Sequence, residues 1–534
     1  MARTPLFRKL ILALQAARRE NLQSQDLPAP LPRSAGNWSR RKFIKATAIT
    51  GMVGLAEGCL SLPVLANGNN EAPKIVVIGA GIAGLNAAYQ LKKQGIIAEI
   101  YEARTRVGGR MLSATLADGL VVDLGAELIN TDHADMLALV DEFGIELFNK
   151  LDDVNSVALP KEAYFFNGTR ITEAELADDL RLIAAQITAD AALLDQDWDT
   201  YARPLDLLSV TDYLNIHANK IPSPYIRELL TSAIHTEYGV EPSESSALQL
   251  ITLLPVVDGQ TVDLLSYSDE VYAVVGGSAQ ITDALGEELA GQLHLGMSLA
   301  EIKPKDGRYR LKFTDGQFVS ADIVIVTIPF PVLSNISLAV PMPGRLRNFI
   351  NTAKLGSNEK VIGTFNSRFW RQANGFTLAA WGVPGVSEIW DETQRQDQRS
   401  DGALNFFLGG NQARQLDAST NTNQLGNQFV AALNQKVPGA SAAAKGFFVR
   451  SGWTNSAYTQ GGYANFKPGQ LTRFSNYFWV ESADPESAQS VNAGNIIFAG
   501  EHLSDEYYGF MNGAAQTGRL AAALAVEKYQ LLND

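Results

Sequence analysis

The sequence is nearly devoid of cysteine, because only Cys59 carries a thiol among its 534 residues. A single cysteine cannot form a disulfide within the chain, and it cannot build a cysteine-ligated metal site. Histidine is also scarce, and the five histidines lack the spacing that zinc sites use. Cys59 lies in the first 66 residues, which we expect to be removed, so the sequence predicts no thiolate nucleophile and no metal.

Long apolar runs and an excess of basic charge are missing too. After Ala66 we find no hydrophobic span, no low-complexity tract and no internal repeat. The weakly apolar run Ala46–Leu65 is interrupted by Glu57 and by glycines, so it is short for a membrane span. The net charge of −13 argues against a nucleic-acid partner and favours cationic ligands.

The first 66 residues differ from the rest in charge, with ten Lys or Arg against three Asp or Glu. Residues 39–45, SRRKFIK, place two adjacent arginines before the apolar run, which is typical of a twin-arginine export signal. Val64 and Ala66 are small, so they fit cleavage after Ala66. We expect residues 1–66 to be a twin-arginine signal peptide. Its translocation machinery would export the folded protein to the periplasm or outside the cell.

Two alternatives for this region stay open. Ala46–Leu65 would act as a single membrane anchor if it were not cleaved. The first twenty residues have the pattern of a basic amphipathic helix, which would give a peripheral membrane contact or serve only as a long start of the signal. The sequence carries no signal for the oligomeric state.

A dinucleotide-binding unit begins shortly after the signal. Ile75–Ile78 is a short apolar run, as in a buried parallel strand, and a second strand is expected at Ala98–Tyr101. Between them Gly79, Gly81 and Gly84 form the G-x-G-x-x-G pattern, which permits a tight turn and close approach of backbone to a pyrophosphate. Glu102 ends the second strand, where a carboxylate binds ribose hydroxyls. The pattern predicts FAD or NAD binding without separating the two.

The segment after Glu102 resembles the flavin amine oxidases and their wider group, which includes carotenoid desaturases and protoporphyrinogen oxidases. Residues 102–110 read EARTRVGGR, and residues 495–519, NIIFAGEHLSDEYYGFMNGAAQTGR, are similar to the second FAD segment of that family. Residues 276–291 and 299–329 resemble the part that contacts adenine. The resemblance covers most of residues 74–530 and implies FAD as the cofactor.

The resemblance also implies which residues bind FAD. Glu501 would bind the ribityl chain, Leu299 the adenine, and the backbone at Phe510 and Met511 the flavin ring, while Arg110 can neutralise a diphosphate. The monoamine oxidases carry a cysteine that links to FAD where this sequence has Gly462, so the FAD should be noncovalent. The full set of cofactor-binding candidates is Gly79, Gly81, Ala83, Gly84, Glu102, Ala103, Arg104, Gly109, Arg110, Leu299, Thr327, Gly500, Glu501, Phe510 and Met511.

Two internal stretches favour the amine oxidases over the desaturases. In residues 354–370 the resemblance places Lys360 next to a water at the flavin, where a cation assists the reaction with oxygen. In residues 453–470 it places Trp453 against the flavin. Tyr463 and Phe510 would form paired aromatic walls that guide an amine and attract its charge on entry.

The substrate pocket departs from one branch of the family. Several L-amino-acid oxidases hold the substrate carboxylate with an arginine in the segment that matches residues 123–130, and Leu128 stands at that position here. The neighbouring Glu127 would receive a distal cation or serve as a structural carboxylate near FAD, and the sequence does not separate the two. Trp390 is a further candidate pocket residue.

These observations predict an α/β fold with a discontinuous, Rossmann-like FAD-binding domain at residues 70–130, 270–330 and 485–534. A mixed helical and sheet substrate-binding domain would comprise residues 131–269 and 331–484. The expected function is FAD-dependent oxidative deamination of an amine or L-amino acid, with a cationic substrate favoured and oxygen as the acceptor. The alternatives are an amine dehydrogenase with another acceptor, a flavoprotein that binds with little turnover and, less favoured, a desaturase.

Overall fold

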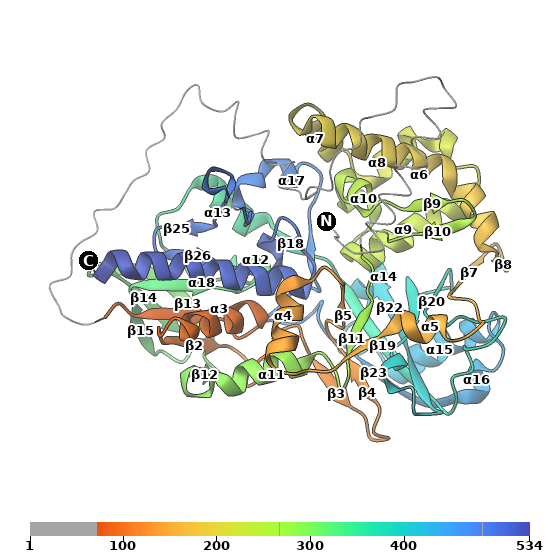
Figure 1. The fold of residues 1–534 in the computed structure, drawn as a ribbon, viewed down its shortest axis with the longest axis horizontal. Helices are drawn as coiled ribbons and strands as arrows, with labels where there is room; N and C mark the ends of the chain where they lie inside the picture. The colour runs from red at the N-terminus through yellow and green to blue at the C-terminus, as the bar shows by residue number, and fades with distance from the viewer. Residues whose placement is uncertain (1–71, 266–267, 483, 534) are drawn as a thin grey trace.

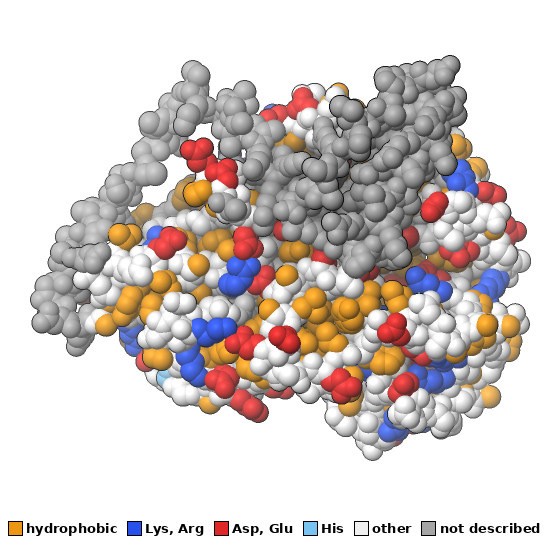
Figure 2. All heavy atoms as spheres, viewed as in Figure 1, with side chains coloured by type: hydrophobic (Ala, Val, Ile, Leu, Met, Phe, Trp, Pro, Cys, Tyr) orange, Lys and Arg blue, Asp and Glu red, His pale blue; other side chains and the backbone are white. Residues whose placement is uncertain are grey.

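The structure is a computed structural model that describes residues 72–265, 268–482 and 484–533. The predicted export signal, its cleavage site and Cys59 lie outside these residues. The described chain has the predicted α/β fold, with two large sheets and helices around them (Figure 1). No helix in this part of the chain is long and apolar enough to cross a membrane. On the face in Figure 2, acidic and basic side chains are interspersed among apolar ones.

The first sheet has six strands in the order β12-β2-β1-β16-β26-β25. Its inner strands are parallel, and every residue of β1 and β16 is buried, which explains why both read as unbroken apolar runs. The strands are β1 (Ile75–Ile78), β2 (Ala98–Glu102), β12 (Leu293–Leu295), β16 (Ile323–Val326), β25 (Asn492–Ala493) and β26 (Ile496–Phe498).

Two helices from opposite ends of the described chain pack against each other beside this sheet. They are α3 (Ile82–Lys93) and α18 (Met511–Asn533), and in Figure 1 α18 is the long blue helix near α3. The Asn86 side chain donates a hydrogen bond of 2.8 Å to the Ala515 carbonyl. A Cβ atom on Gly518 would lie 2.2 Å from the Ala83 carbonyl oxygen, so only glycine allows this close approach.

We expect Gly518→Ala to lower the free energy of unfolding by about 3 kcal/mol, because the new methyl group forces two backbones apart. This loss should exceed the roughly 1 kcal/mol that alanine gains over glycine in a helix. Gly291→Ala is the matched control, since a Cβ there meets nothing within 4 Å. Denaturant unfolding of the holoenzymes measures both, and equal midpoints for the two variants would contradict the close packing.

The second sheet has seven strands in the order β23-β19-β22-β21-β20-β7-β8, and β19 and β22 are buried along their whole length. Helix α15 (Thr422–Asn434) packs against β19 and β23. The strands are β7 (Glu162–Phe166), β8 (Thr169–Ile171), β19 (Asn358–Phe365), β20 (Ala379–Trp381), β21 (Glu388–Asp391), β22 (Gly402–Gly409) and β23 (Ala444–Arg450).

Most helices of residues 131–269 form a group at the upper right of Figure 1. They are α6 (Glu173–Gln196), α7 (Trp198–Asp206), α8 (Val210–Ile216), α9 (Pro224–Tyr238) and α10 (Ala247–Leu253). Helix α6 begins with a capping box between Thr172 and Glu175. Helix α4 (Ala134–Glu142) belongs to the same predicted segment but packs instead against α18, where Arg519 forms an ion pair with Asp135.

Two smaller sheets complete the frame of the site. A three-stranded antiparallel sheet has the order β5-β11-β6, from β5 (Leu128–Ile129), β11 (Tyr272–Val274) and β6 (Leu147–Asn149). A four-stranded sheet has the order β15-β14-β13-β17, from β13 (Leu299–Lys305), β14 (Arg308–Phe313), β15 (Phe318–Ala321) and β17 (Ser337–Leu338).

Candidate functional site

A single large cavity is lined by residues of both large sheets and of the three-stranded sheet. Every site residue predicted from the sequence lines this cavity, with the exception of Gly84. A Cβ on Gly84 would lie 1.9 Å from the Gly79 carbonyl oxygen, so Gly84 serves the turn between β1 and α3. Residues more than 400 positions apart, from Gly79 to Met511, therefore share one cavity.

One end of the cavity fits the adenosine and phosphates of a dinucleotide. Gly79 adopts a φ of 105°, which favours glycine. Helix α3 begins after Gly81 without a side-chain cap, so its first N–H groups are available to phosphate oxygens. Glu102 accepts hydrogen bonds from the backbone N–H groups of Ala80 at 2.7 Å and Arg104 at 2.8 Å. These contacts fix the carboxylate at the place where the ribose of FAD would lie.

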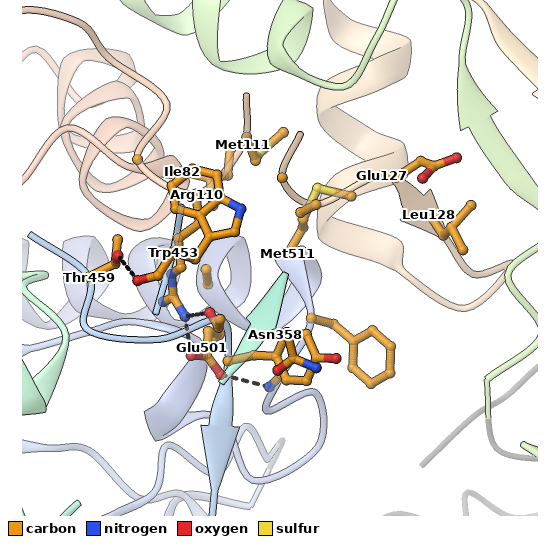
Figure 3. A pocket seen from close by; sticks show the side chains of 18 of the residues that line it. Ile82, Arg110, Met111, Glu127, Leu128, Asn358, Trp453, Thr459, Glu501 and Met511 are labelled. Atoms are coloured by element: carbon orange, nitrogen blue, oxygen red, sulfur yellow. Dashed lines mark hydrogen bonds and ion pairs between the residues drawn. The ribbon is translucent and has the colours of Figure 1, made fainter. Parts of the chain in front are cut away.

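Arg110 and Glu501 join three distant segments beside this end. The Arg110 guanidinium donates to a Glu501 carboxylate oxygen at 2.7 Å and to the Gly462 carbonyl at 2.6 Å (Figure 3). Glu501 also accepts a hydrogen bond of 2.7 Å from the Gly509 backbone N–H. The sequence assigned Arg110 and Glu501 separately to FAD, and the structure shows that they also form an ion pair.

Lys360 extends from β19, the second strand of the seven-stranded sheet, into a buried group of carboxylates. Its ammonium group donates to Glu127 Oε2 at 2.6 Å and to the Asp123 carbonyl at 2.9 Å, and Glu392 Oε2 lies 3.5 Å away. Burial lowers the pKa of Lys360, but the nearby carboxylates outweigh it and raise that pKa above its ordinary value. Lys360 is therefore a cation, and its two hydrogen bonds leave a third N–H for a water molecule.

The sequence left the role of Glu127 open, and its contacts favour a structural carboxylate. Its oxygens contact three donors: Lys360, Arg395 at 3.5 Å, and the Trp390 indole N–H at 3.2 Å. Although burial raises the pKa of Glu127, Lys360 and Arg395 lower it to about 2. The Trp390 ring also lies 5.2 Å from the Lys360 ammonium, so this predicted pocket residue packs against the ion pair.

Arg395 and Glu392 belong to this group and were missed by sequence reasoning. The Arg395 side chain is 1% exposed and lies 3.0 Å from Asp123 Oδ2. Burial raises the pKa of Glu392 well above its usual range, and repulsion by Glu127 adds to this rise. No local pattern marks Arg395 as a site residue. Its partners Asp123 and Glu127 lie more than 260 positions earlier in the chain, although Glu392, three positions earlier, is 3.8 Å away.

The three predicted aromatic residues line the cavity from separate segments. The Trp453 indole donates to the Leu124 carbonyl at 2.7 Å, which fixes the plane of its ring. The Tyr463 hydroxyl donates to the Thr236 carbonyl. The Phe510 ring packs against His133 with 5.1 Å between ring centroids.

Near Tyr463 the cavity is lined by carboxylates that the sequence analysis did not single out. Glu388 is 9% exposed, and its carboxylate makes no hydrogen bond or ion pair with any described residue. Burial raises the pKa of Glu388 well above its usual range, and Glu270 adds to this rise. Burial likewise raises the pKa of Glu270 to about 7. Glu388 and Trp390 share one face of β21 by alternation, which is the sequence signal that would have found Glu388.

Among the described residues, no group of three or more His, Cys, Asp or Glu side chains is arranged to hold a metal ion. The donors that line the cavity are instead suited to FAD at one end and to a small polar molecule at the other. Figure 3 shows Glu127 and Leu128 on the side of the pocket away from Arg110 and Glu501. The cavity thus separates a nucleotide end from a charged end.

Comparison with known proteins agrees with this geometry. Residues 82–526 match the family described as flavin containing amine oxidoreductase. The putrescine oxidase of Kocuria rosea is 26% identical over 475 residues, which cover 84% of this chain and 94% of that protein. An L-amino acid dehydrogenase of Synechocystis sp. is 23% identical over 463 residues, covering 84% of this chain and 93% of that protein.

Solved structures share the fold. A wild-type putrescine oxidase bound to putrescine has a TM-score of 0.69 and 24% identity, covering 85% of this chain and 99% of the other. The cyclohexylamine oxidase of Brevibacterium oxydans IH-35A has a TM-score of 0.70 and 22% identity, covering 86% of this chain and all of the other. At these identities the likeness establishes the fold alone.

Proposed function

The chain belongs to the flavin-containing amine oxidoreductases, with noncovalent FAD as its cofactor, and on that premise we propose that it oxidatively deaminates a cationic amine or amino acid with oxygen as acceptor. The amine becomes an imine, and water hydrolyses the imine to an aldehyde or keto acid and ammonium. Oxygen becomes hydrogen peroxide. Gly462, at the position of the linking cysteine, is consistent with a noncovalent cofactor.

FAD, when bound, accepts the two electrons of the oxidation and supplies them to oxygen. Glu102 and the start of α3 would hold its nucleotide end, and Glu501 its ribityl chain. The aromatic walls at Tyr463 and Phe510, which line the cavity, would exclude water and orient the amine. Lys360 holds a positive charge in the cavity, where it stabilises the negative charge that develops on oxygen.

The single observation that supports a cationic substrate is the unpaired carboxylate of Glu388. A buried carboxylate without a partner is unfavourable, so an ammonium group that reaches it gains an ion pair at little further desolvation cost. Glu270 lies close enough to add to its negative potential. Putrescine, the diamine after which the putrescine oxidase relative is named, agrees with this choice.

A substrate panel tests the proposal. The holoenzyme is mixed in air with monoamines, diamines, polyamines and L-amino acids, and hydrogen peroxide is recorded. We expect peroxide from compounds with a second cationic group and little from simple monoamines. If amines bleach the flavin but no peroxide appears, the electron acceptor is a molecule other than oxygen. If no amine bleaches the flavin, the protein binds its ligand with little turnover.

An amine dehydrogenase is the second candidate, and the contacts of Lys360 favour it. Glu127 at 2.6 Å and Glu392 at 3.5 Å offset the charge of the ammonium group, which reduces the field that oxygen would experience. The Synechocystis relative is itself named a dehydrogenase. Anaerobic bleaching followed by reoxidation with a quinone rather than air would establish this candidate.

We also propose that the protein is exported already folded by the twin-arginine route, to the periplasm or outside the cell. A noncovalent cofactor supports this proposal, because FAD must be enclosed before the chain leaves the cytoplasm. Changing Arg40 and Arg41 to Lys should retain the holoenzyme in the cytoplasm. Fractionation of the producing cells measures this, and unchanged export would overturn the proposal.

The raised pKa of Glu270 predicts a pH dependence of binding. Because this pKa is about 7, the carboxylate ionises between pH 6 and pH 8. We therefore expect 1,4-diaminobutane to bind about tenfold more tightly at pH 8 than at pH 6. In the amine-free protein, the raised pKa of Glu270 also affects the free energy of unfolding. Its stabilising contribution is full below the ordinary Glu pKa of 4.5 and is lost as the pH rises to about 7. Calorimetric titrations at both pH values test this prediction, and equal affinities would contradict it.

A further inference from the structure

Lys150 is a buried cation that the proposed mechanism does not use. It follows β6 and begins α5 (Lys150–Asn155), and the residue is only 4% exposed. Its side chain lines the cavity, and its ammonium group makes no hydrogen bond or ion pair with any described residue. Burying an ammonium group without a counter-ion is costly, so an anion in the cavity is its natural partner.

The three-stranded sheet places Lys150 on the same face as Leu128. Leu128 is opposite Ala273 on β11, and Ala273 is opposite Phe148 on β6. The Lys150 backbone N–H donates a hydrogen bond to the Val271 carbonyl. Lys150 lies two residues after Phe148 and Val271 lies two residues before Ala273, so this bond continues the same antiparallel pairing. Opposed residues of an antiparallel sheet share a face, and so do residues two positions apart. Lys150 therefore projects towards the side of the sheet where Leu128 meets the cavity.

The lining of the cavity agrees with this alternation. Leu128, Asn130 and Lys150 all line it, whereas the intervening Ile129 and Asn149 do not. An arginine at the Leu128 position is what the resemblance implies for carboxylate binding in several L-amino-acid oxidases. The sheet thus places a cation at the end of β6, two strands away from Leu128 and on the same face, in the cavity where this chain lacks that arginine.

The same end of the cavity carries both signs of charge. Lys150 lowers the pKa of Glu270 and Glu388 through its charge, so the three groups lie within electrostatic reach of one another. They nevertheless form no ion pair among themselves. Charges that are close but unpaired leave room for a molecule that bears both an ammonium and a carboxylate group.

We propose that Lys150 binds the carboxylate of the substrate, which makes the substrate a basic L-amino acid whose distal cation meets Glu388. This inference rests on the proposed function and narrows it from cationic amines to diamino acids and their guanidino relatives. Lys150 supplies a point charge on a flexible stem where an arginine would supply a planar fork. The site should therefore accept a carboxylate in more than one orientation.

Matched pairs of compounds test the role of Lys150, because the members of each pair differ only in the carboxylate. They are L-ornithine and 1,4-diaminobutane, L-lysine and 1,5-diaminopentane, and L-arginine and agmatine. We expect the wild-type holoenzyme to reduce its flavin with a higher kcat/KM for each amino acid. Lys150→Met should lower kcat/KM for the amino acids roughly 10- to 100-fold, with no loss for the amines. Lys150→Arg should retain the preference.

Lys161→Met is the control, since Lys161 also lines the cavity but is exposed. Binding of α-methyl-L-ornithine, which has no hydrogen on the α-carbon and cannot be oxidised at that carbon, gives a second readout through the flavin absorbance under anaerobic conditions. Lys150→Met should weaken it by a similar factor. A wild-type enzyme that oxidises only the amines, or a Lys150→Met variant that loses both members of a pair equally, would overturn the inference and leave the proposed function standing. Failure of every compound to bleach the flavin would refute the proposed function instead.

Discussion

Replacing Lys360 by Met should slow reoxidation of the reduced holoenzyme by oxygen roughly 100-fold, while flavin reduction by the amine changes less than about fivefold. Lys360 supplies positive charge at a buried position, and superoxide formation is the step that gains most from it. The amine reacts in its neutral form and gains little from the same charge. Stopped-flow measurements of the two half-reactions separate the effects.

The same substitution should cost stability as well. Removing the ammonium group breaks the ion pairs of Glu127 and Glu392 with Lys360 and leaves both carboxylates with Arg395, at 3.5 and 3.8 Å; breaking a buried pair costs about 3–5 kcal/mol. The double variant Lys360→Met with Glu127→Gln removes one charge of each sign and should recover part of that loss. Lys354→Met, on the exposed part of the preceding segment, should change neither rate nor stability.

These two readouts distinguish a role in the reaction from a role in folding. If Lys360→Met unfolds at lower denaturant concentration but reacts with oxygen at the wild-type rate, the lysine is only structural. Such a result would favour the dehydrogenase candidate, because the carboxylates around Lys360 would then have cancelled its charge. A slow reaction with oxygen in the stabilised double variant would establish the role in oxidation.

Replacing Glu388 by Gln should lower kcat/KM for 1,4-diaminobutane roughly 100-fold and leave butylamine within about threefold of wild type. The two amines have the same chain length, so the difference reports the distal ammonium group alone. Gln keeps the size and shape of the side chain, removes its charge and replaces one acceptor oxygen by an NH2 donor. Glu287→Gln, at an exposed position on α11 (Ala279–Glu288), is the control for a general loss of negative charge.

Stability provides an independent check on Glu388. Burial raises its pKa in the folded protein, so its contribution to stability is full below the ordinary carboxyl pKa and is lost as pH rises through the folded value. Gln does not ionise, so we expect Glu388→Gln to be more stable than wild type at pH 8 in the absence of amine. If Glu388→Gln lowers kcat/KM equally for both amines, or if the variant is less stable than wild type at pH 8, Glu388 supports β21 and does not bind the substrate.

The nucleotide end of the site could be predicted because its parts are local in the chain. Residues 75–110 contain the strand, turn, helix and carboxylate in one continuous stretch, and each needs only its neighbours to take its conformation. Lys360, Trp453 and Tyr463 were found by resemblance, since each lies in a short motif. The α/β fold follows from the same motifs together with the buried strands β1 and β16.

The pairing of charges at the charged end could not be predicted, because the paired residues come from distant segments and have no common spacing. Glu127 contacts Lys360 and Arg395 across 233 and 268 positions of sequence, and only the tertiary fold brings these residues together. The burial that shifts the pKa of Glu388 and leaves Lys150 without a partner is likewise a property of the assembled cavity.

The sequence by itself therefore determined the cofactor, the fold and the class of reaction. Turns and helix starts are local structures, and a local stretch of chain is enough to specify them. The tertiary structure decided which charges are paired and which remain open to a substrate. Pairing depends on distances of a few ångströms between groups that are far apart in the chain, and on the exclusion of water around them.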